Sequence, residues 1–193
     1  MRSTGPTIGV LSLQGCVHPH RPHIESLGIL FKEVKTAEDM EQIDGLILPG
    51  GESTTMLKLI AIFNLSQGLE ATFKRVPVWG ICAGAILIAQ EVHSPRQRSF
   101  GLMQIEIERN SYGRQLESFH TEVEKYPVSF IRAPKILSVG KGVTVLASRE
   151  KSPIWVEQGR VMATTFHPEL TSEYPSPMHR RFGEMVSAAL SVS

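Results

Sequence analysis

Cysteine is scarce in this chain: only Cys16 and Cys82 occur among its 193 residues, and neither belongs to a CxxC pair. Two cysteines are too few to staple a domain of this size, which excludes a disulfide scaffold. A reduced chain in the cytoplasm is therefore the default expectation.

An excess of charge of one sign is also missing. The 20 basic and 19 acidic residues leave a net charge of +1, and no block of Lys or Arg offers a footprint for nucleic acid or an anionic membrane. No apolar run approaches the roughly 18 residues that span a bilayer. The first residues, "MRSTGPTIGVLSLQG", run from a short apolar stretch into a turn, which predicts a first strand and not a signal peptide.

What the chain does contain is an ordinary globular composition, 41% hydrophobic and 20% charged, and alternating strand and helix patterns. A single domain over residues 1–193 is expected. Strands are predicted at 7–13, 31–36, 44–51 and 76–81, and helices at 20–30, 53–63 and 83–92. Unbroken apolar strands that alternate with helices predict an α/β fold, with a central mostly parallel sheet between helical layers.

The second half changes character. Shorter strands are predicted at 102–110, 128–134, 143–148, 153–158 and 160–167, with a hairpin turn at "EQGR" and a closing amphipathic helix over 178–190.

The stretch "GICAG" places Cys82 between Gly80 and Gly84, on a turn from a buried strand to a helix. Small flanking residues allow a sharp turn that holds a nucleophile in a strained backbone conformation at a helix start. There, free N–H groups, among them that of Ala83, favour a thiolate and can hold a developing oxyanion. A free cysteine is also a common small packing residue, and the turn alone does not decide between these interpretations.

A nucleophilic cysteine needs a base, and "FHPEL" supplies a candidate. His167 ends an apolar strand, and Glu169 lies two residues on, so both side chains can point to the same side with Pro168 between them. A carboxylate beside an imidazole fixes the tautomer and orientation of the ring. Since Cys82 and His167 both follow apolar strands, a parallel sheet brings them to one carboxyl edge, which favours catalysis over packing.

The other histidines are expected to be less informative. His18, His20 and His23 cluster beside Cys16 in "CVHPHRPH", but their spacing matches no standard zinc pattern and favours a polar loop or helix start. His93, His120 and His179 stand in polar contexts typical of the surface. No metal and no cofactor are expected.

With these residues in place, the chain resembles a class I, triad-type glutamine amidotransferase, which implies a flavodoxin-like fold, a three-layer α/β sandwich around the mostly parallel sheet. More narrowly, it is similar to the glutaminase subunit of pyridoxal 5′-phosphate synthase over about Thr7 to Phe182. The stretches that carry this resemblance are "IGVLSLQG", "DGLILPGGESTTM" (44–56), "ERNSYGRQLESF" (108–119), "FIRAP" (130–134) and "FHPELT" (166–171).

The resemblance implies a role for each matching residue. Cys82 is the nucleophile, His167 the general base and acid, and Glu169 the residue that orients His167. The implied glutamine-binding residues are Gly51, Glu52, Ser53, Arg109, Ile131 and Arg132, and the backbones of Gly51 and Ala83 form the oxyanion hole. By charge, an Arg suits the α-carboxylate of glutamine and Glu52 its α-ammonium.

The resemblance also implies an activity and a partner. Glutamine is hydrolysed to glutamate and ammonia, and the ammonia passes to a synthase subunit that builds pyridoxal 5′-phosphate, in vitamin B6 biosynthesis. Little activity is expected until that subunit binds.

Two departures accompany the resemblance. Ile81 stands where the family usually has Thr, and Ala85 where a bulkier apolar residue is common. The alternatives are a triad glutaminase for another biosynthetic pathway, a non-enzymatic partner-binding subunit of the same fold, and a cysteine hydrolase or chaperone of the wider sandwich fold. The "GGESTT" and "YGRQ" stretches disfavour the first, and an intact Cys82, His167 and Glu169 disfavour the second. The third does not need the "HPE" arrangement.

Overall fold

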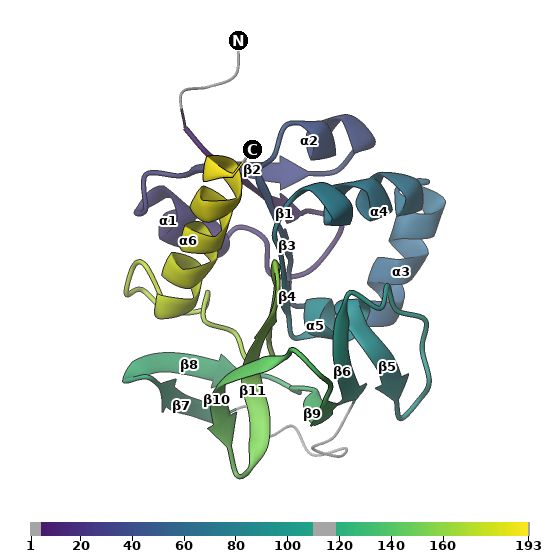
Figure 1. Cartoon of the computed structure of the whole chain (residues 1–193), viewed down its shortest axis with the longest axis vertical. Coiled ribbons are helices and arrows are strands. Elements are labelled where there is room, and N and C mark those ends of the chain that lie inside the picture. Colours follow the sequence, from purple (N-terminus) through teal and green to yellow (C-terminus); the bar gives the residue numbers. More distant parts are fainter. Residues whose placement is uncertain (1–4, 110–118, 193) are drawn as a thin grey trace.

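The computed structural model describes residues 5–109 and 119–192, and a seven-stranded sheet forms its centre (Figure 1). In spatial order the strands are β10 (Thr144–Arg149), β11 (Ser152–Gln158), β12 (Val161–Thr164), β4 (Val78–Ile81), β3 (Gly45–Leu48), β1 (Thr7–Leu11) and β2 (Leu30–Val34). The five strands from β12 to β2 run parallel, whereas β10 and β11 are antiparallel additions at one edge. The predicted mostly parallel sheet is confirmed.

Helices cover both faces of this sheet (Figure 1). On one face lie α1 (His20–Glu25) and α6 (Pro177–Ser191); on the other lie α2 (Ala37–Glu41), α3 (Ser53–Ile62), α4 (Ser66–Arg75) and α5 (Ala83–Ile88). Strands β3 and β4 are buried along their whole length, as their apolar sequences require. Full burial of a large apolar side chain such as that of Trp79 or Phe182 stabilises the fold by about 1.5–3 kcal/mol.

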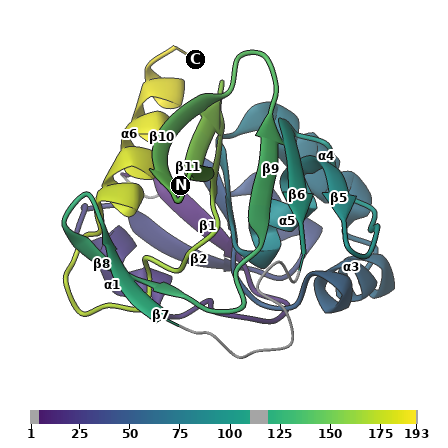
Figure 2. The same ribbon diagram turned by 90° about the horizontal axis from the view of Figure 1, so that it is seen from below.

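Two smaller sheets complete the chain. Strands β5 (Ala89–His93), β6 (Met103–Glu108) and β9 (Lys135–Val139) pack on the side of α3 and α5. The β7 (Phe119–Val123) and β8 (Tyr126–Phe130) ribbon packs on the side of α1 and α6, as the view from below shows (Figure 2). No helix among the described residues is both long and apolar enough to span a bilayer.

The sequence-based prediction of a helix over 83–92 is wrong at its end. Helix α5 ends at Ile88, and residues 89–93 form β5, paired with β6. The carbonyls of Leu87 and Ile88 accept hydrogen bonds from the amides of Phe100 and Leu102, at 2.7 and 2.8 Å. The backbone is already extended at Ala89, with φ −63° and ψ 152°, so the chain leaves the helix there and these carbonyls pair with residues 100–102 instead. Elements α2, α4, β7 and β9 were not predicted.

Candidate active site

Cys82 lies between β4 and α5 in a conformation that few L-residues adopt, with φ 49° and ψ −102°. Its backbone N–H donates to the carbonyl of Thr164 in β12 at 2.8 Å, which fixes the turn to the neighbouring strand. A Cβ atom on Gly84 would meet the Leu48 carbonyl oxygen at 2.0 Å, and one on Gly80 would meet the Gly84 oxygen at 2.6 Å. The tight turn therefore requires both flanking glycines.

His167 and Glu169 follow β12, the strand directly beside β4. The His167 amide donates to the carbonyl of Ser129 at 2.8 Å, which anchors the segment to β8. Nδ1 of His167 lies 2.7 Å from Oε1 of Glu169, and these side chains are 5% and 0% exposed. The structure thus places a buried imidazole–carboxylate pair at the same sheet edge as Cys82.

The electrostatics of this pair favour a charged imidazole. Burial alone would lower the pKa of His167, but interactions with the thiols of Cys16 and Cys82 and with the Glu169 carboxylate raise it above its ordinary value. Burial raises the pKa of Glu169, yet its hydrogen bond and charge attraction to His167 lower it overall. The carboxylate is therefore ionised and stabilises an imidazolium.

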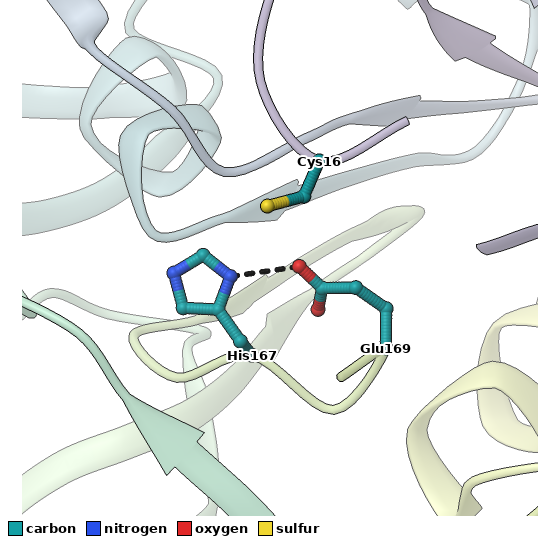
Figure 3. A group of neighbouring side chains, drawn as sticks. All are labelled: Cys16, His167 and Glu169. Atoms are coloured by element: carbon teal, nitrogen blue, oxygen red, sulfur yellow. Dashed lines mark hydrogen bonds and ion pairs between the residues drawn. The ribbon is translucent and has the colours of Figure 1, made fainter. Parts of the chain in front are cut away.

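Cys16 is the unexpected neighbour of this pair (Figure 3). Its Sγ points toward the His167–Glu169 hydrogen bond, and one ligand-type atom from each of the three residues lies within 4.8 Å of the others. The Cys16 amide donates to the carbonyl of Gly50 at 3.0 Å, so the β1–α1 loop closes over the end of β3. Nothing in the local sequence of Cys16 signalled this position.

The predicted residues converge on one cavity of about 350 Å³. All of the sequence-predicted site residues line it except Glu169, which lies behind His167. The cavity wall consists of Gln14, Cys16, Gly51, Glu52, Ser53, Cys82, Ala83, Ile86, Arg109, Ile131, Arg132, Pro134 and His167. Sequence reasoning missed Gln14, Cys16, Ile86 and Pro134. Ile86 and Pro134 lie in the same segments as predicted site residues, whereas Gln14 and Cys16 come from the loop between β1 and α1.

Glu52 and Arg109 supply opposite charges on this wall. Nη2 of Arg109 lies 3.3 Å from Oε1 of Glu52, and the Arg109 side chain is only 11% exposed. Glu52 also caps α3, where its carboxylate accepts from the amides of Thr54 and Thr55 at 3.2 and 2.7 Å. Partial burial raises the pKa of Glu52, but these hydrogen bonds outweigh it and lower the pKa to about 2. Helix α3 begins at Ser53, as predicted, and Glu52 is its N-cap.

Ile131 and Arg132 follow β8 on the opposite wall. The Ile131 carbonyl oxygen lies 4.0 Å from Sγ of Cys82, and Arg132 has a positive φ of 44°. The "YGRQ" motif lies outside the described residues. Ile81 does not line the cavity; it is fully buried in the apolar layer that contains Trp79 and Phe182.

The prediction for the remaining histidines is partly wrong. His18 is exposed and His120 also faces solvent, but His20, His23 and His179 are buried, at 0%, 0% and 1% exposure. His179 was expected at the surface. The packing of α1 against α6 encloses all three rings, with those of His23 and His179 stacked at a centroid distance of 4.2 Å.

The sequence of this chain matches that of a known protein family. Residues 10–187 match the model of the SNO glutamine amidotransferase family. The chain is 42% identical over 187 residues to the pyridoxal 5′-phosphate synthase subunit PdxT of Thermotoga neapolitana, with 93% of this chain and 98% of that protein covered. It is 47% identical over 178 residues to the same-named protein of Solibacter usitatus, with 86% and 93% covered.

Solved structures show the same architecture. A crystal structure of a glutamine amidotransferase, 40% identical, superposes with a TM-score of 0.84 over 93% of this chain and 98% of that one. A second glutamine amidotransferase, from Thermotoga maritima and 14% identical, superposes with a TM-score of 0.56 over 98% of this chain and 85% of that one, and supports the fold alone.

Proposed function

The chain belongs to the SNO glutamine amidotransferase family, and on that premise we propose that it is the glutaminase subunit of a pyridoxal 5′-phosphate synthase. The observation that carries the proposal is the convergence of Cys82, His167 and the Glu52–Arg109 pair on one cavity. The reaction is hydrolysis of L-glutamine to L-glutamate and ammonia, without a cofactor.

The chemistry follows from the positions of three side chains. Cys82, as thiolate, attacks the carboxamide carbon of glutamine to form a tetrahedral intermediate. His167 protonates the departing ammonia and then takes a proton from the water that hydrolyses the glutamyl thioester. Glu169 orients the ring through Nδ1 and stabilises the imidazolium, since their 2.7 Å contact is fully desolvated.

The cavity wall matches the charges of glutamine. Arg109 and Arg132 provide cations for the α-carboxylate, and Glu52, ionised at neutral pH, accepts the α-ammonium. The amides of Gly51 and Ala83 serve the oxyanion; by its position at the start of α5, the Ala83 amide has no helical acceptor. Ser53 and the Ile131 backbone complete the substrate contacts.

The proposal extends to organisation and partner. Residues 1–193 act as one domain, and ammonia is delivered to the synthase subunit that forms pyridoxal 5′-phosphate. A cytoplasmic location is part of the proposal and agrees with the free thiols of Cys16 and Cys82.

The test measures glutamate release from glutamine by the chain with and without the cognate synthase subunit. Wild type with the synthase subunit should turn over glutamine, and Cys82→Ala should abolish turnover while still forming the complex. His18→Ala, at an exposed position outside the cavity, is the control and should keep wild-type turnover. Complex formation without cysteine-dependent turnover by wild type would instead favour a non-enzymatic binding subunit.

A further inference from the structure

Where α1 contacts α6, the structure contains a continuous buried series of hydrogen-bonded groups. Oγ of Ser176 lies 2.6 Å from Nδ1 of His179, and Nε2 of His179 lies 2.9 Å from Nδ1 of His20. None of the three residues exceeds 1% exposure. The proposed glutaminase reaction does not use these hydrogen-bonded side chains. Burying so many polar groups costs free energy of folding unless each is hydrogen-bonded.

The backbone N–H of His179 and the hydroxyl of Ser176 determine which atom donates in each of these hydrogen bonds. The Ser176 Oγ already accepts from the backbone N–H of His179 at 3.1 Å, and the only acceptor for its own proton among the described residues is Nδ1 of His179. His179, with its Nδ1 accepting, carries its proton on Nε2 and donates it to Nδ1 of His20. A neutral His20 therefore carries its proton on Nε2.

Both rings are neutral at physiological pH. Burial lowers the pKa of His20 to about 4, against the raising effect of Glu169, and burial also lowers the pKa of His179 well below its ordinary value. His23 and His167 are the other titratable groups that face this hydrogen-bonded series, and both lower the pKa of His20.

The last nitrogen of this hydrogen-bonded series is Nε2 of His20, and the charge of Glu169 acts on this ring to raise its pKa against the effect of burial. Nε2 of His20 and Oε2 of Glu169 are buried, and neither has a hydrogen-bond partner among the described residues. The histidine cluster abuts this residue, since Nε2 of His23 lies 3.4 Å from the Glu169 backbone carbonyl and its ring stacks on that of His179. A buried donor and a buried carboxylate oxygen thus both lack a direct partner, in two residues that interact electrostatically within one enclosed cluster. Unpaired buried polar groups of this kind are commonly bridged by an internal water.

We propose that His20 is a positioning residue for the glutaminase reaction: its Nε2–H holds the second oxygen of Glu169 through one buried water. Oε1 then remains committed to His167, and the carboxylate cannot rotate away from the ring. Ser176 and His179 act one step further back, because they keep the proton of His20 on Nε2. This inference rests on the proposed function for its kinetic consequence but not for its tautomers.

The first experiment reads the protons directly. Ring ¹⁵N chemical shifts of the isolated chain, assigned with His20→Gln and His179→Gln, should show the neutral Nε2–H tautomer for both residues at pH 7. An Nδ1–H tautomer for His20 would overturn the proposal, since its Nε2 would then present a lone pair to the carboxylate.

The second experiment measures kcat and KM for glutamine in the complex with the synthase subunit. His20→Leu should lower kcat about 10- to 100-fold, as is usual for loss of a group that orients an active-site ligand, with KM unchanged. His20→Gln returns an N–H near the position of Nε2 and should recover most of kcat. His18→Leu, two residues before His20 but 75% exposed at its side chain, is the matched control.

Should His20→Leu fail to fold, Ser176→Ala keeps all three rings and removes only the hydroxyl that sets their direction. Ser176→Ala should shift the His179 tautomer and lower kcat. Ser176→Thr keeps a hydroxyl at this position and should retain the wild-type tautomer and the wild-type kcat. Equal kcat in wild type and His20→Leu, or equal losses in the Leu and Gln variants, would overturn the proposal. Failure of the proposed function is recognised separately, because wild type itself would then lack Cys82-dependent turnover.

Discussion

Gly50 lies against the imidazole of His167 so closely that a Cβ atom on this glycine would stand 2.2 Å from Cε1 of the ring. The end of β3 therefore forms the wall that keeps His167 in place, although the two residues are distant in sequence. The ring is held on its other sides by Glu169 and by the backbone pairing of its own segment with Ser129.

Gly50→Ala should consequently displace the ring without removing any catalytic group. A displacement near 1 Å is expected to reduce kcat about 100-fold, because proton transfer depends steeply on geometry. Steady-state glutaminase kinetics of the complex provide the measurement. Gly5→Ala, where the nearest heavy atom would be 3.9 Å away, should behave as wild type. Wild-type kcat in Gly50→Ala would show that the wall does not position His167.

Glu169→Gln should lower kcat by about 10²- to 10⁴-fold, since an amide of the same size can neither stabilise the imidazolium nor fix its tautomer reliably. KM for glutamine should change little, because Glu169 does not line the cavity. Glu173→Gln, four residues on and exposed, is the control. A loss confined to KM would argue that Glu169 serves substrate binding instead.

Arg109→Gln should act mainly on glutamine binding. The substitution removes a nearly buried cation from the cavity wall and leaves Glu52 without its 3.3 Å partner. A charge-assisted hydrogen bond to the substrate carboxylate is worth about 1.5–3 kcal/mol, so kcat/KM should fall roughly 10- to 100-fold, chiefly through KM. Arg98→Gln, at an exposed position, should have no effect. An unchanged KM in Arg109→Gln would remove this residue from the substrate site.

Ile81→Thr should test the residue that departs from the family pattern. Ile81 is fully buried in an apolar layer and does not reach the cavity, so kcat/KM should remain at the wild-type value. The buried hydroxyl and lost methyl group should lower the free energy of unfolding by about 1–3 kcal/mol, measured by urea denaturation. Altered glutamine affinity with unchanged stability would contradict this assignment.

Stability should decrease on acidification below pH 6.5 because of the buried histidines. The pKa of His20 is about 4 in the folded chain and 6.5 in the unfolded chain. Below pH 6.5 the unfolded chain therefore binds a proton at this residue, whereas the folded chain does not until the pH approaches 4. Its contribution is fully present above pH 6.5 and is lost as the pH falls toward 4, a decline of about 3 kcal/mol. The lowered pKa of His179 acts in the same direction.

Urea denaturation at pH 6.5, 5.5 and 5 measures this decline, because the raised pKa of His167 affects stability only above pH 6.5. His20→Gln should flatten it, whereas His18→Gln should reproduce the wild-type slope, since His18 is exposed. The same slope in His20→Gln and wild type would mean that the decline comes from other groups. The lowered pKa of Glu169 affects a separate window, below its ordinary pKa of 4.5.

Local patterns were sufficient to predict several parts of this protein. Apolar runs separated by helical patterns predicted the parallel sheet, because burial of both faces leaves no alternation of polarity along a strand. The glycines around Cys82 and the spacing of His167 and Glu169 are also local, and short-range sterics largely determine such turns.

Tertiary structure alone decided the remaining features. Helix α5 ends at Ile88 where the chain turns extended to pair with β6, and Cys16 reaches the cavity because its loop bonds to Gly50. His20 and His179 are 159 residues apart and meet only when α1 packs beside α6. Their polar sequence context is typical of surface residues. Hydrogen bonds between these rings offset the free-energy cost of burying them, and no local sequence pattern could reveal those partners.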